Sequence, residues 1–151
     1  MITETFLIFL SSWILENTEF TKKINNPEVF SISQQEMSKK ACFSSINCKV
    51  KAYYVKDVGI FYIDKLEPET KVCDQSIILH ELIHHYQNNN NKVIDLDEKT
   101  LWTLQEKQAL FYQNLFLITQ KRKNRNEGPE NILQCEGGSY LDLQYKYNRD
   151  N

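Results

Sequence analysis

The chain of 151 residues lacks the features that mark several large classes of protein. Its net charge is only −2 at pH 7, so we expect no general attraction to nucleic acid or to anionic lipid. No internal repeat is present, and the most apolar window, residues 6–15, is too short to span a bilayer. The length and these absences together predict one domain that covers residues 1–151.

The N-terminal segment also lacks the basic start of a signal peptide and has Thr3 and Glu4 instead. Its apolar residues recur at helical spacing, at Phe6, Phe9, Leu10, Trp13 and Ile14. This spacing predicts an amphipathic helix over residues 3–16 that packs on the core.

A pair of short segments rich in aromatic and β-branched residues lies in the middle of the chain. Residues 48–55 alternate in polarity, residues 57–59 have the composition of a turn, and residues 60–63 follow as a second strand. This pattern predicts a β-hairpin. Upstream, residues 29–32 predict another extended piece, followed by a helical turn from Ser33.

Histidine is scarce, and all three copies fall within six residues, at His80, His84 and His85. The first two form the pattern H-E-x-x-H with Glu81, inside an apolar run that favours a helix. Positions i and i+4 share a helical face, so His80 and His84 can hold one metal ion. Glu81 would then lie close enough to deprotonate a metal-activated water. His85 points about 100° away and is expected to be a surface or supporting group.

The ends of this helix are also predicted. Asp74 is a favourable N-cap, and the four asparagines at 88–91 favour a stop. The alternative to a metal site is an amphipathic helix whose polar face merely carries the histidines. A helix this apolar would be buried on most sides, and buried imidazoles need partners, which a shared metal would supply.

A third ligand must come from elsewhere, because hydrolytic zinc usually takes three protein ligands and leaves a position for water. No other histidine exists, so we expect a carboxylate. The downstream candidates are Asp95, Asp97, Glu98, Glu106, Glu127, Glu130 and Glu136. Asp95 and Glu98 are expected instead to form a capping box that opens the next helix.

Glu106 is the preferred ligand. It lies inside a predicted helix over residues 100–121, and Ala109 on the same face would let this helix pack closely against the first. The alternative is a surface glutamate paired with Lys107 or Gln105. The basic run at the end of this helix, residues 121–125, is expected to complement the helix dipole.

At these residues the chain resembles the zincin metallopeptidases, and more closely small bacterial gluzincin-like proteins. In those proteins two histidines of H-E-x-x-H and a glutamate from a following helix bind zinc. The resemblance covers about residues 50–115. It implies that His80, His84 and Glu106 hold Zn²⁺ and that Glu81 is the catalytic base. It also implies an α+β, zincin-like fold with an N-terminal helix, a small sheet and two packed metal-bearing helices.

The sequence departs from that family at two supporting positions. Thermolysin-type gluzincins have an aspartate four residues after the ligand glutamate, and here Leu110 stands there. The partner that orients a ligating imidazole is therefore open, with Gln113 or a backbone carbonyl as candidates. The tyrosine or histidine that steadies the oxyanion has no motif match. The candidates for it are Tyr112, Tyr140 and Tyr145.

The four cysteines are never spaced as C-x-x-C, which argues against a zinc knuckle. Their even number favours two disulfides, and we prefer Cys42–Cys48 with Cys73–Cys135. Such bridges predict a periplasmic or secreted protein whose precursor carries a signal peptide. The alternative is four reduced thiols in a cytoplasmic protein.

The expected activity is that of a zinc-dependent metallopeptidase acting on a peptide or protein substrate. Two alternatives remain. One is a non-catalytic zinc-binding or partner-binding module, in which a fourth protein ligand such as Glu136 replaces the water. The other is a metal-free helical interaction protein. The sequence indicates neither the substrate nor the oligomeric state.

Overall fold

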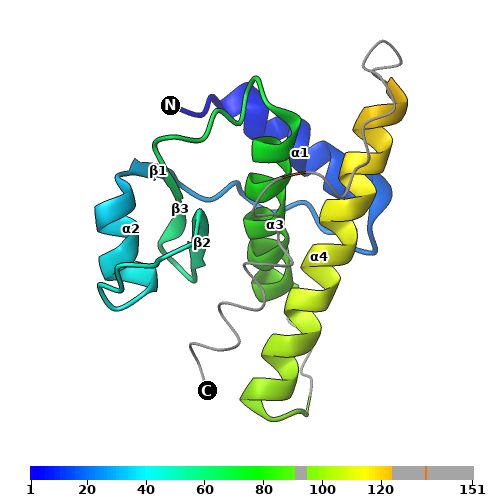
Figure 1. Cartoon of the computed structure of the whole chain (residues 1–151). Coiled ribbons are helices and arrows are strands. Elements are labelled where there is room, and N and C mark those ends of the chain that lie inside the picture. Colours follow the sequence, from blue (N-terminus) through cyan, green and yellow to red (C-terminus); the bar gives the residue numbers. More distant parts are fainter. Residues whose placement is uncertain (91–94, 124–134, 136–151) are drawn as a thin grey trace.

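The computed structural model describes residues 1–90, 95–123 and 135, and it has the α+β class that the sequence predicts (Figure 1). The elements in chain order are α1 (Glu4–Asn17), β1 (Val29–Ile32), α2 (Gln34–Ala41), β2 (Ala52–Val55), β3 (Gly59–Ile63), α3 (Val72–Asn89) and α4 (Glu98–Lys123). The N-terminal helix, the hairpin and the two consecutive helices are confirmed.

A three-stranded mixed sheet lies beside the helices, with the strand order β1-β3-β2. The predicted hairpin is present, because β2 pairs antiparallel with β3. The predicted extended piece is β1, which pairs parallel with β3 from Val29 opposite Ile60 to Ile32 opposite Ile63. The central strand is therefore β3, and β2 forms one edge of the sheet.

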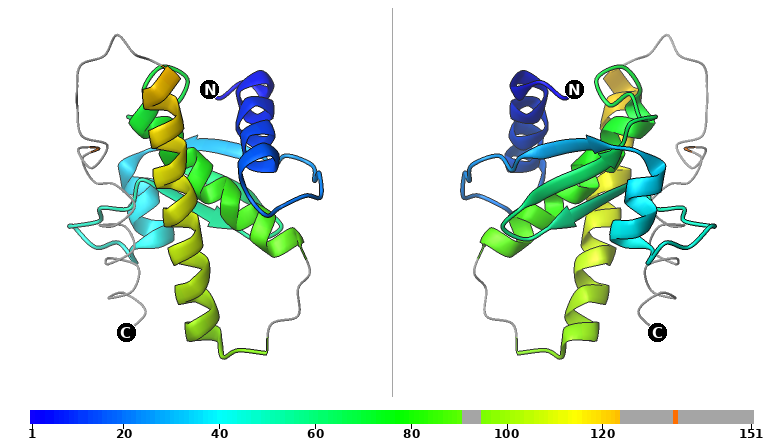
Figure 2. Two further views of the ribbon diagram at one scale, coloured as in Figure 1. Left: turned by 90° about the vertical axis from the view of Figure 1, so that its right-hand side faces the viewer. Right: turned by 90° about the vertical axis from the view of Figure 1, so that its left-hand side faces the viewer.

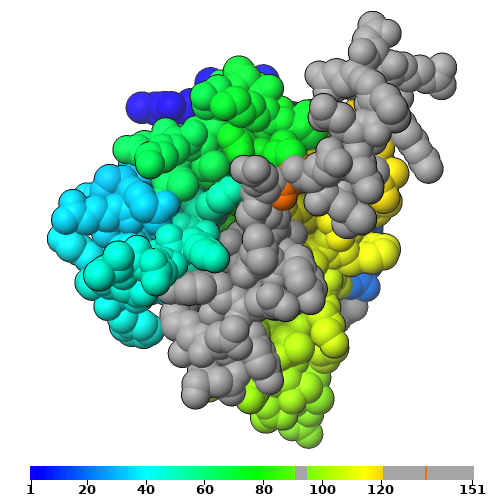
Figure 3. Space-filling model, viewed as in Figure 1, coloured from blue at the N-terminus to red at the C-terminus, as the bar shows by residue number. Residues whose placement is uncertain are grey.

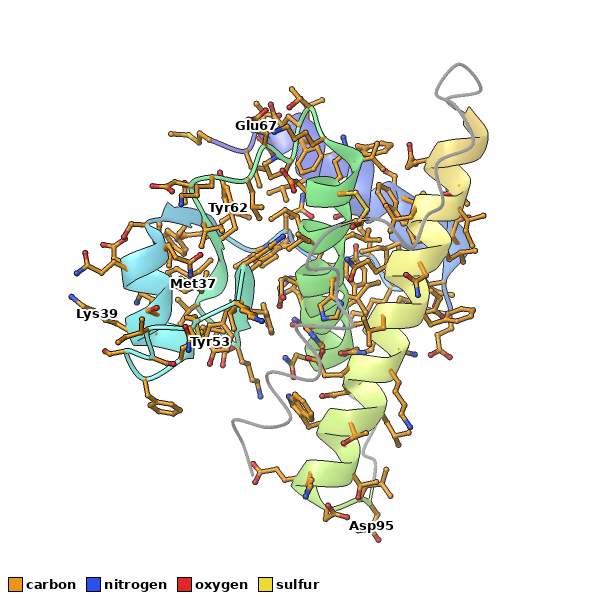
Figure 4. All side chains as sticks on the ribbon, in the orientation of Figure 1. Met37, Lys39, Tyr53, Tyr62, Glu67 and Asp95 are labelled. Carbon is orange, nitrogen blue, oxygen red and sulfur yellow. A yellow bond between two sulfur atoms is a disulfide. The ribbon has the colours of Figure 1, made fainter. Side chains whose placement is uncertain are left out.

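The sheet is covered on both faces, and β3 alternates between two hydrophobic clusters. Ile60 and Tyr62 belong to the larger cluster with residues of α1, α3 and α4. Ile63 belongs to the smaller cluster with Met37, which α2 directs toward the sheet (Figure 4). Ser33 begins α2 with a capping box, as its side chain accepts from the Glu36 backbone N–H at 3.1 Å.

The position of α3 is central to the molecule. It lies between the sheet and α4 in Figure 1, and the two side views agree on its packing against both (Figure 2). In the space-filling view α2 and α4 form opposite flanks of this face (Figure 3). Trp13 of α1 binds α4 through two contacts. Its indole Nε1 donates to Thr119 Oγ1 at 3.0 Å, and its ring packs edge-on against Phe116.

Two predicted helix starts are wrong. Lys71, not Asp74, is the N-cap of α3; Asp74 lies in the first turn, and its carboxylate accepts from the Glu67 backbone N–H at 2.9 Å. A negative charge in the first turn still complements the helix dipole. At α4 the backbone N–H and the hydroxyl of Thr100 bond to Asp97 rather than Asp95, and these bonds lower the pKa of the Asp97 carboxyl.

Both predicted disulfides are present, Cys42–Cys48 and Cys73–Cys135. The first closes the loop after α2, and the second ties residue 135 to the first turn of α3. Disulfides persist in oxidising compartments, so the two bridges favour such a location. Within the described ranges, the structure contains no helix with the length and apolar character needed to cross a bilayer.

Candidate metal centre

Two helices bring three ligating side chains together. His80 and His84 lie one turn apart on α3, and Glu106 comes from α4. One ligand atom from each can be chosen so that all three lie within 4.8 Å of one another. Glu106 Oε1 lies 2.8 Å from His84 Nε2, and Glu106 Oε2 lies 3.2 Å from His80 Nε2.

The group is withdrawn from solvent. Glu106 is 2% exposed and His80 is 4% exposed, so the surface-glutamate alternative is wrong. The close approach of the helices has the expected cause, since Ala109, one turn beyond Glu106, is fully buried in the larger cluster. A buried carboxylate facing two imidazole nitrogens is a set of Lewis bases that could hold a metal ion.

Each of the two imidazoles that face Glu106 has a glutamine at its other ring nitrogen. His80 Nδ1 lies 2.9 Å from Gln113 Oε1. Of the two candidates for orienting this imidazole, Gln113 and a backbone carbonyl, the structure therefore has Gln113. His84 Nδ1 lies 2.8 Å from Gln87 Oε1. Sequence reasoning missed Gln87, although its position three residues after His84 on a helix was a usable signal.

A cavity of about 150 Å³ opens beside the histidines, and Glu81 forms part of its wall together with His84 and Glu106. Glu81 is 3% exposed, and its Oε2 accepts a hydrogen bond of 3.0 Å from the backbone N–H of Tyr54 in β2. The rest of the lining is supplied by Tyr53, Tyr54, Asn88, Trp102 and Gln105. The carboxylate predicted to act as base therefore borders a space that admits small molecules.

His85 faces away from the three ligating groups, as predicted. Its Nε2 donates to the Asn25 carbonyl oxygen at 2.8 Å, and its Nδ1 lies 3.3 Å from the Tyr54 hydroxyl. Burial raises the pKa of the Tyr54 phenol, and a hydrogen bond with Asn88 offsets part of that rise. Tyr54 also lines the cavity, as does Tyr53, and sequence reasoning named neither as a site residue.

The other predicted candidates do not meet at this centre in the described part of the chain. The Tyr112 hydroxyl accepts from the Glu19 backbone N–H at 3.4 Å. Asp95 is exposed before the start of α4, at its lower end in Figure 4, and Asp97 and Glu98 are exposed as well. The candidates that lie outside the described residues are Glu127, Glu130, Glu136, Tyr140 and Tyr145.

The fold and the centre define an α+β protein with a buried His-His-Glu group between two helices. Residues 2–120 match a family described as a domain of unknown function, DUF6647, and the chain belongs to that family. No curated protein and no solved structure matches the chain.

Proposed function

We propose that the protein is a zinc-dependent peptidase whose metal is held by His80, His84 and Glu106 and whose catalytic base is Glu81. The observation that carries the proposal is the cavity that three of these four residues line. Glu81, His84 and Glu106 all line it, while the family match leaves the chemistry open. A purely structural metal site has no need of a second carboxylate, beyond the ligand Glu106, beside an open space.

Zinc suits the donor set better than a softer or harder metal. Two imidazole nitrogens and one carboxylate oxygen are a set typical of hydrolytic zinc sites. All four cysteines of the chain are in disulfides, so no thiolate competes for the metal. Magnesium and calcium would require mainly oxygen ligands.

When bound, zinc would lower the pKa of water in the cavity and polarise the scissile carbonyl. Glu81 accepts a proton from the attacking water while the oxygen of that water bonds to the carbonyl carbon. It then delivers that proton to the departing nitrogen as the C–N bond breaks. The Tyr54 N–H holds one carboxylate oxygen of Glu81, which fixes the orientation of the base.

The substrate backbone has a natural place along β2. This strand is an edge of the sheet; its Tyr54 N–H points away from β3 but is already bonded to Glu81, so a peptide would pair with the other outward-facing backbone groups of β2. An extended peptide could add to such an edge through main-chain hydrogen bonds. Tyr53 and Trp102 on the cavity wall would then contact side chains of the substrate. The two disulfides favour a periplasmic or secreted site of action.

The first prediction concerns Glu81. Glu81→Gln should keep zinc bound, because the ligands are untouched, and should lower peptide hydrolysis by roughly 10²–10⁴-fold through loss of the general base. Zinc content is measured by elemental analysis, and hydrolysis with labelled casein and a mixture of internally quenched peptides. Glu16→Gln, at an exposed position on α1, is the matched control.

Wild-type zinc-loaded protein that cleaves none of these peptides would favour the non-catalytic zinc-binding module. Hydrolysis that persists unchanged in Glu81→Gln would reject the role of Glu81 as the base. Loss of zinc from this variant would instead make Glu81 a ligand.

A further inference from the structure

The two glutamines behind the histidines sit in hydrogen-bond chains whose direction can be determined. The oxygen and nitrogen of a carboxamide are nearly alike in shape, so the rest of each chain must decide which one faces the imidazole. Both chains end at backbone carbonyl oxygens, which can only accept hydrogen bonds. Working back from those carbonyls fixes every donor.

The chain behind His80 starts at Cys73. The Ser76 hydroxyl lies 2.6 Å from the Cys73 carbonyl oxygen and must donate its single proton there. Ser76 Oγ therefore accepts from Gln113 Nε2, at 3.1 Å. Gln113 Oε1 is then left facing His80 Nδ1 at 2.9 Å, and this contact is a hydrogen bond only if Nδ1 carries a proton.

The chain behind His84 gives the same result. Gln87 Nε2 lies 2.9 Å from the Gln105 carbonyl oxygen and must donate to it. A second donation from the same nitrogen reaches Gln108 Oε1 at 2.8 Å. Gln87 Oε1 thus faces His84 Nδ1, which must also be protonated.

Both imidazoles consequently keep their lone pair on Nε2 when they are neutral. The two Nε2 atoms lie 3.2 Å apart and face the Glu106 carboxylate. Two lone pairs and a carboxylate that converge in a buried space repel one another unless a cation or protons lie between them. The third histidine has the opposite arrangement, because His85 donates from Nε2 to the Asn25 carbonyl oxygen.

We infer that Gln113 and Gln87 are positioning residues that lock His80 and His84 in the Nδ1–H form, so that both present Nε2 to the metal. The inference rests on the proposed zinc site. In many zinc sites a carboxylate accepts the hydrogen bond that orients a ligating histidine. Here neutral carboxamides on α4 and α3 accept it instead.

The direct test is the tautomer of each histidine, measured by long-range ¹H–¹⁵N NMR of the imidazoles. With only three histidines in the chain, the spectrum is simple to assign. Zinc-loaded protein should show Nδ1–H for His80 and His84 and Nε2–H for His85. Metal-free protein, measured at a pH where the imidazoles are neutral, should show the same pattern. A protonated Nε2 on His80 or His84 in this neutral form would overturn the inference.

The second test measures zinc affinity by competition with a chelator. Gln113→Leu removes the acceptor while roughly keeping the volume, and should weaken zinc binding about 10–100-fold. Gln113→Glu should retain tight binding, because its carboxylate still accepts from Nδ1 and the Ser76 hydroxyl can turn to donate to it. Gln120→Leu, at a buried glutamine two turns further along α4, is the matched control and should bind zinc like the wild type.

Equal affinity in Gln113→Leu and wild type would overturn the positioning role, and so would an equal loss in Gln120→Leu. The NMR measurement of the tautomers uses the wild-type protein, so it still tests the inference if Gln113→Leu folds poorly. Wild-type protein that binds no zinc yet shows the expected tautomers would overturn the proposed peptidase and support the orientation of the two imidazoles.

Discussion

At the scale of single residues, the site depends on polar groups that are buried with defined partners. Glu81 has a backbone N–H on one oxygen, and each metal-facing imidazole has a carboxamide oxygen on Nδ1. Such contacts restrict rotamers before any ligand arrives, which is what accurate placement of catalytic groups requires. Glu106 is also buried, and a buried carboxylate is stable only beside a cation or a hydrogen-bond donor.

Gly59 is a second residue with a defined constraint. Its φ of 147° is rarely adopted by residues with a side chain, and an added Cβ would overlap the Glu28 carbonyl oxygen. Gly59→Ala should therefore lower the free energy of unfolding by about 3 kcal/mol, through backbone strain. Chemical denaturation measures the loss. Val58→Ala, at the neighbouring half-exposed position, should change it by less than about 0.5 kcal/mol. Equal stability of Gly59→Ala and wild type would show that the strand start can shift at little cost.

The residues of the His-His-Glu group could be predicted to come together because the spacing and scarcity of the histidines are local facts. His80 and His84 are one helical turn apart, and the need for a third ligand singled out Glu106. The hydrogen bond from Tyr54 to Glu81 could not be predicted, because it joins residues 27 positions apart through the placement of an edge strand. The role of Tyr54 in the cavity was missed for the same reason.

At the scale of elements, the pairing of α3 with α4 creates the candidate metal centre. α3 supplies both histidines and Glu81, the proposed base, and α4 supplies Glu106, the proposed third ligand, together with Gln113. The small side chain of Ala109 permits close contact at the crossing. The sheet contributes by placing its β2 edge beside the cavity, so that this strand orients Glu81 and is the proposed docking edge for a peptide.

Hydrophobic periodicity was sufficient to predict most elements, including α1, the hairpin and both long helices. The parallel pairing of β1 with β3 was not predicted, because pairing between distant strands leaves no local pattern in the sequence. The two helix starts were predicted wrongly for a different reason. Aspartates are favourable both at the N-cap and in the first turn, so Asp74 fits either position and the packing of the preceding loop decides.

At the scale of the whole molecule, the two disulfides contribute unequally. Cys73–Cys135 spans 62 residues and encloses nearly all of α3 and the whole of α4, whereas Cys42–Cys48 spans six. Loop-closure entropy predicts that replacing the first pair by serine costs about 4 kcal/mol of stability and the second pair about 2 kcal/mol. Denaturant unfolding of the two double variants checks the order. A larger loss from the short loop would mean that packing, rather than chain entropy, dominates.

The long bridge also bears on the metal centre. Cys73 lies in the first turn of α3, and its carbonyl oxygen ends the hydrogen-bond chain that reaches His80 through Ser76 and Gln113. The disulfide and His80, a proposed metal ligand, are thus anchored to the same short stretch of helix. Because the other elements pack around α3, a molecule of this size can bury polar side chains such as His80 and Glu106 almost completely.

The most direct test of the account is a crystal structure of zinc-loaded protein with anomalous data collected at the zinc edge. A catalytic zinc site should give a single anomalous peak between α3 and α4, about 2.0–2.2 Å from His80 Nε2, His84 Nε2 and a Glu106 oxygen, with a solvent molecule as the remaining ligand. No peak between the helices, or a fourth protein side chain in place of the solvent, would contradict it.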